Sequence, residues 1–416
     1  MGVTLEQYRL EHGPLRLEDA VDAAEKLLNQ KYKTQWRKRG RRACLAVPVL
    51  SLCLFGIVHL INVAASLVPV FWDDHLFLPK WGEPGQLGEG IASYPTDFTR
   101  DVTPKPCHSH NDYWRRVPLY EAVHSGCTGV EADVWLFGDE LFVGHSTSAL
   151  TRNRTLRSLY VDPLVQLLDY QNPTAGFGNE TMNSVFDQDP SQTLVLLVDF
   201  KTSGPEILPV LMDQLAALRE KHYLSYFNGR AVLLGPVTVV ATGNAPFDLL
   251  TANTTYRDIF FDAPLANMFE EPVDAFPDPS HRALPTFTQP PESKQVSSQS
   301  HLHRGKSGQG TVGTSAESHF DFLNSYYASV SFTKSIGHVW NGRLSAEQMR
   351  LIRGQIAGAH RRGLKVRYWN TPKWPVGLRN HVWDVLVKEG VDYLNGDDLI
   401  AMTRMDWTRK KHHGWF

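Results

Sequence analysis

The sequence predicts an α/β protein: a (β/α)8 TIM barrel preceded by one transmembrane helix. From about residue 101 onward, short apolar runs alternate with helical patterns, which is typical of parallel strands joined by helical crossovers. Several of these runs end in acidic, His or Lys residues, at the strand ends where such barrels carry their chemistry. Residues 43–72 contain no Asp, Glu, Lys or Arg, and this run is long enough to span a bilayer.

The composition is that of a folded protein with a sizeable core. The chain has 416 residues, 42% of them hydrophobic, and a formal net charge of −2. This charge gives no reason to expect nucleic-acid binding, and nothing in the composition indicates a protein partner.

The N-terminal region predicts a cytoplasmic segment over residues 1–42, a transmembrane helix over 43–66 and a Pro/Gly-containing linker over 67–100. Pro48 and Pro69 are expected to end the apolar helix or to kink it. Basic residues precede the apolar run, and Asp73 and Asp74 follow it. The positive-inside rule therefore places the N-terminus in the cytoplasm and the remainder in the lumen or outside the cell, as in a single-pass protein of the secretory pathway. The basic residues are Lys31, Lys33, Arg37, Lys38, Arg39, Arg41 and Arg42.

Asparagine and cysteine positions bear on this topology. Asn153, Asn179 and Asn253 each begin an N-glycosylation acceptor triplet, which has meaning only on a lumenal or extracellular face. Cys107 and Cys127 lie in the predicted barrel. The expected layout puts them at opposite ends of adjacent strands, which argues against a disulfide between them.

The barrel is expected over residues 101–405, with a C-terminal tail over 406–416. Residues 280–318 are rich in Ser, Gln, Gly and Pro, so we expect a disordered excursion loop there. A short first strand ends at 107–110. The other predicted strands are 130–134, 140–143, 193–199, 231–234, 259–261, 329–332, 365–369 and 392–394. The predicted helices are 119–124, 205–221, 346–362 and 379–389.

Carboxylates at two strand ends predict a metal site. Glu131 and Asp133 are two residues apart on a strand, so both point to one side. Oxygen ligands of this kind suit Mg²⁺ or Ca²⁺, and Asp199 could complete the set. Lys201 lies on the same side as Asp199. It could hold a phosphate oxygen, or it could form a structural ion pair with Asp199.

Three histidines lie close to these acids in the chain. His108 and His110 end the first strand, and their side chains would point the same way on an extended backbone. His145 follows the run 141–143. Imidazoles beside a metal-binding acidic pair are the groups that general acid and base catalysis uses.

The order of these motifs resembles the phospholipase C-like phosphodiesterase superfamily, which includes the glycerophosphodiester phosphodiesterases. The block His-Ser-His-Asn-Asp-Tyr at 108–113, Val-Glu-Ala-Asp-Val at 130–134 and Thr-Leu-Arg-Ser-Leu-Tyr at 155–160 is similar to the fungal family called altered inheritance of mitochondria protein 6. Weaker matches at 366–371 and 390–398 resemble the seventh and eighth strands. The resemblance covers residues 100–405.

The resemblance implies a (β/α)8 barrel that hydrolyses a phosphodiester, such as a glycerophosphodiester or a phospholipid. It implies Glu131, Asp133 and Asp199 as ligands of a divalent cation, and His145 as one catalytic histidine. The other is His108 or His110, and the spacing to Glu131 favours His110. The glycerophosphodiesterases have Arg directly after the first His, whereas this chain has Ser109 or Asn111 there. Either phosphate binding therefore falls to Lys201, Arg115 or Arg116, or the substrate differs from that of the glycerophosphodiesterases.

Three other interpretations stay open. A metal-dependent amidohydrolase would use His108 and His110 on zinc, but it needs further His on later strands, and the expected strand ends near Gly235, Asp262, Phe332 and Asn370 offer none. A serine hydrolase at 144–148 lacks the final Gly of its motif. A non-catalytic, membrane-anchored barrel that acts as a binding or scaffold protein would keep the same residues.

Overall fold

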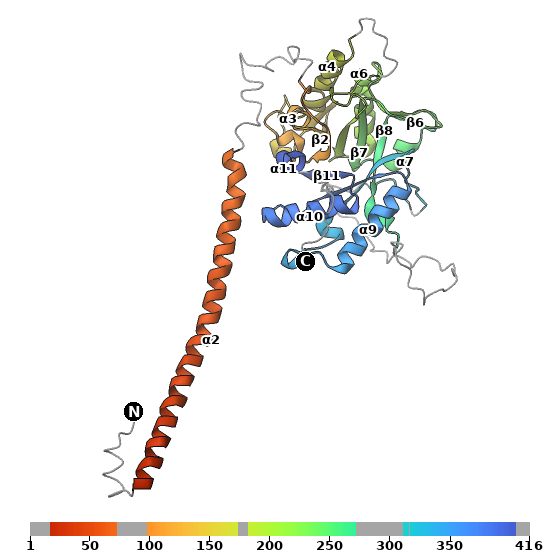
Figure 1. Cartoon of the computed structure of the whole chain (residues 1–416). Helices are drawn as coiled ribbons and strands as arrows, with labels where there is room; N and C mark the ends of the chain where they lie inside the picture. Colours follow the sequence, from red (N-terminus) through yellow and green to blue (C-terminus); the bar gives the residue numbers. More distant parts are fainter. Residues whose placement is uncertain (1–16, 73–97, 174–181, 272–310, 316, 405–416) are drawn as a thin grey trace. The chain divides into compact units, whose positions relative to one another are not determined.

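The computed structural model describes residues 17–72, 98–173, 182–271, 311–315 and 317–404 (Figure 1). The chain divides into two compact units, Met1–His75 and Leu76–Phe416, and each is described by itself. The linker expected at 67–100, the loop at 280–318 and the tail at 406–416 fall largely outside the described residues. At the described end of that loop, the Phe247 N–H donates to the Val312 carbonyl over 3.0 Å, so this end contacts the barrel.

Over its described residues the first unit is one helix, α2 (Leu17–Trp72). It joins the predicted cytoplasmic segment to the predicted transmembrane segment without a break, and it continues through Pro48 and Pro69 instead of ending there. The stretch Ala46–Ala65 has a mean hydropathy of 2.1, and none of it is buried. By length and composition it is a candidate membrane span.

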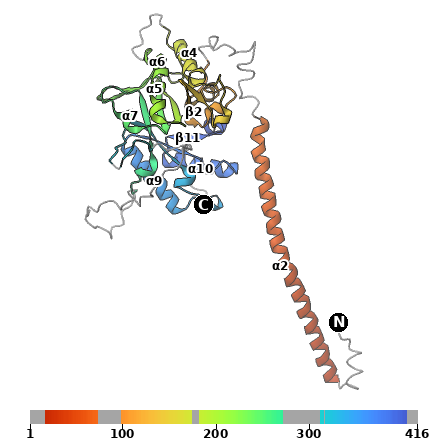
Figure 2. The same ribbon diagram turned by 180° about the vertical axis from the view of Figure 1, so that it is seen from behind.

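The second unit contains a closed barrel of eight parallel strands, which confirms the predicted fold (Figures 1 and 2). Neighbouring strands follow the order β1-β11-β10-β9-β8-β7-β4-β2, and β1 pairs with both β11 and β2 to close the ring. The strands are β1 (Lys105–Ser109), β2 (Cys127–Phe137), β4 (Leu194–Phe200), β7 (Val237–Gly243), β8 (Ile259–Pro264), β9 (Ser325–Ser331), β10 (Lys365–Trp369) and β11 (Tyr393–Gly396).

Two predicted strands lie outside the ring. β3 (Glu140–Val143) pairs antiparallel with β2. The segment predicted at 231–234 contributes β6 (Val232–Leu233), which forms a small antiparallel pair with β5 (Tyr226–Phe227). The fourth barrel strand is β7 instead. Gly235 and Pro236 divide one apolar stretch into two, and only the second half pairs with β4.

Helices cover the outside of the barrel (Figure 2). Helix α9 begins with a capping box in which Ser345 and Gln348 each satisfy the other's free backbone N–H. The helix predicted over 205–221 is two helices that meet at Leu215. The helices are α3 (Tyr120–Ser125), α4 (Asp162–Gln171), α5 (Gly204–Gln214), α6 (Ala216–Arg219), α7 (Phe247–Thr251), α8 (Phe332–Ser335), α9 (Ala346–Arg361), α10 (Val376–Glu389) and α11 (Leu399–Arg404).

A disulfide joins Cys107 to Cys127, contrary to the expectation from the sequence. The two Cα atoms are 4.9 Å apart, and both residues are buried. β1 and β2 run parallel, and Cys127 begins β2 as the register partner of Lys105, so Cys107 in the middle of β1 lies only two residues further along the neighbouring strand. The bridge links β1, which carries His108, to β2, which carries Glu131 and Asp133.

We expect Cys107→Ser with Cys127→Ser to lower the free energy of unfolding by about 3 kcal/mol. The reason is that the bridge closes a loop of 20 residues of sequence separation and so restricts the unfolded chain. Urea unfolding followed by circular dichroism measures this loss. Cys44→Ser with Cys53→Ser is the control, because both are exposed free thiols. Equal stability of the two double variants would contradict the prediction.

Candidate active site

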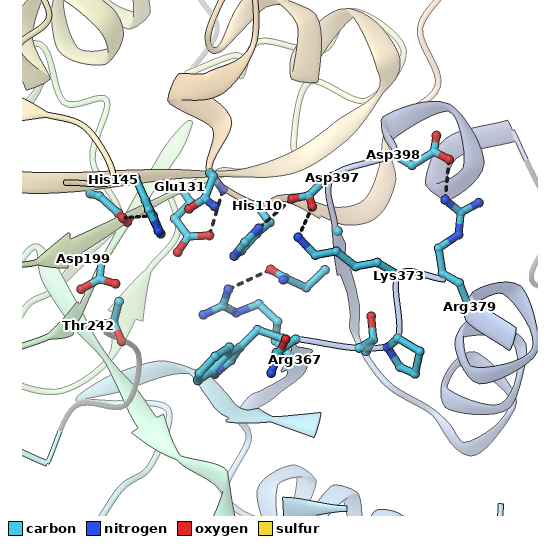
Figure 3. A pocket seen from close by; sticks show the side chains of 18 of the residues that line it. His110, Glu131, His145, Asp199, Thr242, Arg367, Lys373, Arg379, Asp397 and Asp398 are labelled. Atoms are coloured by element: carbon cyan, nitrogen blue, oxygen red, sulfur yellow. Dashed lines mark hydrogen bonds and ion pairs between the residues drawn. The ribbon is translucent and has the colours of Figure 1, made fainter. Parts of the chain in front are cut away.

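A cavity of about 240 Å³ opens at the C-terminal ends of the barrel strands (Figure 3). Its lining comes from most of the ring, so the site depends on closure of the barrel. The lining residues are His110, Asn111, Glu131, Asp133, His145, Asp199, Lys201, Thr242, Arg367, Trp369, Asn370, Thr371, Pro372, Lys373, Arg379, Trp383, Asn395, Gly396, Asp397 and Asp398.

Three buried carboxylates gather on one wall of this cavity. Glu131 and Asp133 lie on β2, and Asp199 on β4 is the direct register partner of Asp133. One oxygen from each lies within 4.8 Å of the other two. Oδ1 of Asp133 and Oδ1 of Asp199 are buried and have no hydrogen-bond partner among the described residues. Unpaired buried carboxylate oxygens are costly, so this cluster fits a hard divalent cation such as Mg²⁺ or Ca²⁺.

Lys201 lies against the same carboxylates. Its Nζ is 2.5 Å from Asp199 Oδ2 and 3.0 Å from Asp133 Oδ2, so the structural ion pair considered from the sequence is present. Burial raises the pKa of Asp199 to about 7, and the neighbouring Asp133 and Glu131 add to the rise while Lys201 opposes it. The ammonium therefore offsets only part of the acidic charge.

His110 lies just beyond the end of β1 and faces the cavity (Figure 3). Its Nδ1 is 2.7 Å from Asp397 Oδ1. Burial alone would lower the pKa of His110, but the charges of Glu131 and Asp397 outweigh it and raise the pKa. Asp397 in turn pairs with Lys373 over 2.6 Å. The imidazole is therefore held in place in a setting that favours its protonated form.

His108 is fully buried inside β1 and does not line the cavity. The Tyr327 hydroxyl lies 3.3 Å from its Nδ1, and its Nε2 is 3.8 Å from Glu131 Oε2. Burial, followed by the charges of Arg367 and His110, holds its pKa well below the usual value. His108 is thus a neutral imidazole behind Glu131, whereas His110 has access to the cavity.

His145 reaches the cavity from the residues that follow β3. Its Nδ1 is 3.7 Å from Asp133 Oδ2 and 3.4 Å from the Tyr113 hydroxyl, and its side chain is 53% exposed. The Trp114 ring packs on the imidazole with 4.9 Å between the ring centroids. His145 and His110 therefore flank the carboxylates, and His145 is the more accessible of the two (Figure 3).

Two further residues of the site have no counterpart in the sequence prediction: Tyr113 behind the carboxylates and Arg367 in the cavity lining. Tyr113 is buried, and its hydroxyl lies 2.8 Å from both Asp133 Oδ2 and Asn111 Oδ1. Arg367 crosses the barrel interior from β10. It donates to Ser329, Asn395 and Asp262 over 2.9 to 3.2 Å. The sequence offered one indication of this role, because Arg367 is a charged residue inside an otherwise apolar predicted strand.

The remaining predicted residues lie away from the cavity. Arg115 donates to the Ser109 hydroxyl and to the Asp397 carbonyl, and it is not part of the lining. Asn153 and Asn253 are exposed, as glycan acceptors must be, and Asn179 lies outside the described residues.

Comparison with known proteins assigns the family. The profile of the AIM6-like phosphodiesterase domain matches residues 96–262, which include Glu131, Asp133, His145 and Asp199. The altered inheritance of mitochondria protein 6 homolog of Arthroderma benhamiae is 36% identical over 322 residues, which cover 75% of this chain and 87% of the relative. The chain belongs to this family.

Two further members extend the comparison. The altered inheritance of mitochondria protein 6 of Eremothecium gossypii is 32% identical over 332 residues, 77% of this chain and 73% of the relative. The altered inheritance of mitochondria protein 6 of Lachancea thermotolerans is 32% identical over 332 residues, which cover 76% of this chain and 68% of the relative. No solved structure matches the chain.

We expect Mg²⁺ or Ca²⁺ to stabilise the barrel of this family member. A cation at about a hundredfold above its Kd should raise the free energy of unfolding by about 3 kcal/mol, because it binds only the folded carboxylate cluster. Asp199→Asn should abolish this response. Asp169→Asn, which removes a surface pair with Lys221, is the control. Thermal unfolding with cation and with chelator measures the effect, and a full response in Asp199→Asn would place the ion elsewhere.

Proposed function

We propose that this chain is a membrane-anchored, metal-dependent phosphodiesterase that cleaves its substrate by general acid and base catalysis with two histidines. The observation that carries this proposal is the arrangement of one cavity, in which a buried carboxylate cluster lies between His110 and His145. Membership of a family named for a phosphodiesterase domain supports the reaction class.

Glu131, Asp133 and Asp199 would hold the cation, which supplies polarisation of a phosphate oxygen when bound. The two histidines carry the protons. His110, charged beside Asp397, gives a proton to the leaving-group oxygen as the P–O bond breaks. His145 is accessible and takes a proton from the attacking water as the new P–O bond forms. Asp397 fixes the His110 ring through Nδ1, which leaves Nε2 to face the reacting group.

The negative charge of the phosphate needs cationic partners inside the cavity. Lys201 is the nearest cation to the carboxylate cluster, so we assign it the phosphate oxygens, as the sequence predicts. Arg367 lines the same cavity and is fixed by three hydrogen bonds. Arg115 was also a candidate, but it does not line the cavity, and its guanidinium donates to the Ser109 hydroxyl and the Asp397 carbonyl.

We expect His110→Ala and His145→Ala each to lower turnover by about 10² to 10⁴-fold, the usual contribution of a general acid or base. Glu131→Ala should also lower turnover, because it removes a proposed ligand of the cation. The assay uses bis-p-nitrophenyl phosphate and glycerophosphodiesters, with Mg²⁺, with Ca²⁺ and with chelator. His360→Ala is the control, because this histidine pairs with Asp392 far from the cavity lining. Unchanged activity in His145→Ala and Glu131→Ala would refute the site. Absence of turnover by the wild type with either metal would favour a binding or scaffold role.

We expect the pH profile to report the proton on His110. Its raised pKa keeps the acid form populated above about pH 6.5, the usual histidine value, and the rate falls as the pH rises through the raised pKa. Asp397→Asn removes the carboxylate that favours the charged ring, so the alkaline limb should move to lower pH. Asp398→Asn, which removes the neighbouring carboxylate paired with Arg379, should leave the limb in place. Equal shifts in both variants would contradict this role.

The location proposed for the barrel is the lumen of the secretory pathway or the cell exterior. A buried disulfide suits an oxidising compartment, and the candidate span follows a basic segment. For protein made in a eukaryotic cell, endoglycosidase treatment should increase gel mobility. Substitution of Asn153 and Asn253 by Gln should remove part of that shift. An unchanged band for the wild type would contradict a lumenal barrel.

A further inference from the structure

Three tryptophans are exposed at the end of the barrel where the cavity opens. The exposed fractions are 56% for Trp114, 78% for Trp340 and 52% for Trp374. Trp114 follows β1, Trp340 follows β9 and Trp374 follows β10. Because β9, β10, β11 and β1 are consecutive in the ring, these residues occupy one continuous arc. We call Trp114, Trp340, Trp374 and the loops 332–345 and 370–375 the tryptophan arc.

The arc borders the proposed active site. Trp114 packs on His145, and Trp374 follows Lys373, whose ammonium pairs with Asp397 beside His110. A hydrogen bond connects the two loops, because the Thr333 hydroxyl donates to the Asn370 carbonyl over 2.9 Å. A surface bound to the arc would therefore meet the mouth of the cavity.

The two loops of the arc carry basic side chains, and the acidic residues after β11, Asp397 and Asp398, are paired with Lys373 and Arg379. Loops 332–345 and 370–375 contain Lys334, Arg343 and Lys373 and no Asp or Glu. Lys334 lies 6.0 Å from the centre of the Trp369 ring, at the cavity wall. Exposed aromatic rings interleaved with basic side chains match the chemistry of a membrane interface: tryptophan favours the headgroup region, and each nearby Lys or Arg adds attraction to anionic lipid.

We propose that the tryptophan arc docks on the surface of an anionic phospholipid bilayer. The candidate span in α2 supports a bilayer as the occupant, since the same chain carries a segment suited to membrane insertion. The inference goes beyond the proposed function, because binding at this surface does not require turnover. Its consequence is that the cavity opens toward lipid headgroups.

The test is hydroxyl-radical footprinting of the full-length chain, read by mass spectrometry. The chain is placed in nanodiscs of phosphatidylcholine, in nanodiscs of phosphatidylcholine mixed with phosphatidylserine, and in detergent. We expect oxidation of Trp340 and Trp374 to fall several-fold only in the phosphatidylserine nanodiscs. Tyr256 is the internal control. It is exposed and precedes the N-terminal end of β8, so its oxidation should not change.

Charge-reversal variants test the electrostatic part. Lys334→Glu with Arg343→Glu should abolish the protection, and the neutral pair Lys334→Gln with Arg343→Gln should reduce it. Arg230→Glu, an exposed change in the β5–β6 turn, should leave it intact. Unchanged Tyr256 oxidation and circular dichroism identify folded variants, and the neutral pair serves if the reversed pair misfolds.

Three outcomes would overturn the proposal. Equal oxidation of the tryptophans in all three settings would show that no lipid covers them. Equal protection in all three, detergent included, would show that the chain itself or a second copy covers the arc. Equal protection by both kinds of nanodisc would show that anionic lipid is not recognised.

Discussion

Mutual repulsion among three carboxylates in a closed barrel is the constraint around which the rest of the site is arranged. β2 and β4 place Asp133 and Asp199 in direct register, and Glu131 is one step along the same face. Such groups cannot all stay charged in a low-dielectric interior without compensation. The Lys201 ammonium and the Tyr113 hydroxyl compensate part of this negative charge. The carboxylate oxygens left without a partner define where a cation fits.

The opposite wall of the cavity is organised by cations and their own counterions. β10 brings Arg367 to Asp262, and β11 brings Asp397 to His110 and Lys373. These pairs keep the cationic groups in fixed positions, and they separate the acidic half of the site from the basic half. The closed barrel makes this division possible, because strands that are far apart in the sequence all end around the mouth of one cavity.

Much of this arrangement could be predicted from the sequence because strand periodicity fixes the side of each residue. Alternation on β2 placed Glu131 and Asp133 on one face, and the alternation of strands and helices predicted the barrel. Periodicity does not determine how deeply a side chain is buried, so it could not separate buried His108 from accessible His110. The two differ because β1 ends at Ser109, between them. Pairing partners are also set by tertiary contacts. The barrel strand β7 was therefore confused with the β6 segment before it, and the Cys107–Cys127 bridge, which depends on the relative register of β1 and β2, was not expected.

The ion pairs of Lys201 have a consequence for the order in which ligands bind. One ammonium lies between two of the carboxylates, so the folded barrel already holds a positive charge against the acidic cluster before any ligand binds. A cation at the unpartnered Oδ1 atoms would share both carboxylates with Lys201 and weaken its ion pairs. An ammonium that is less fully paired in a buried cavity favours a new anion. A phosphate group could supply that anion. Cation and anionic ligand would then each increase the affinity for the other, a reciprocal coupling that one side chain could transmit.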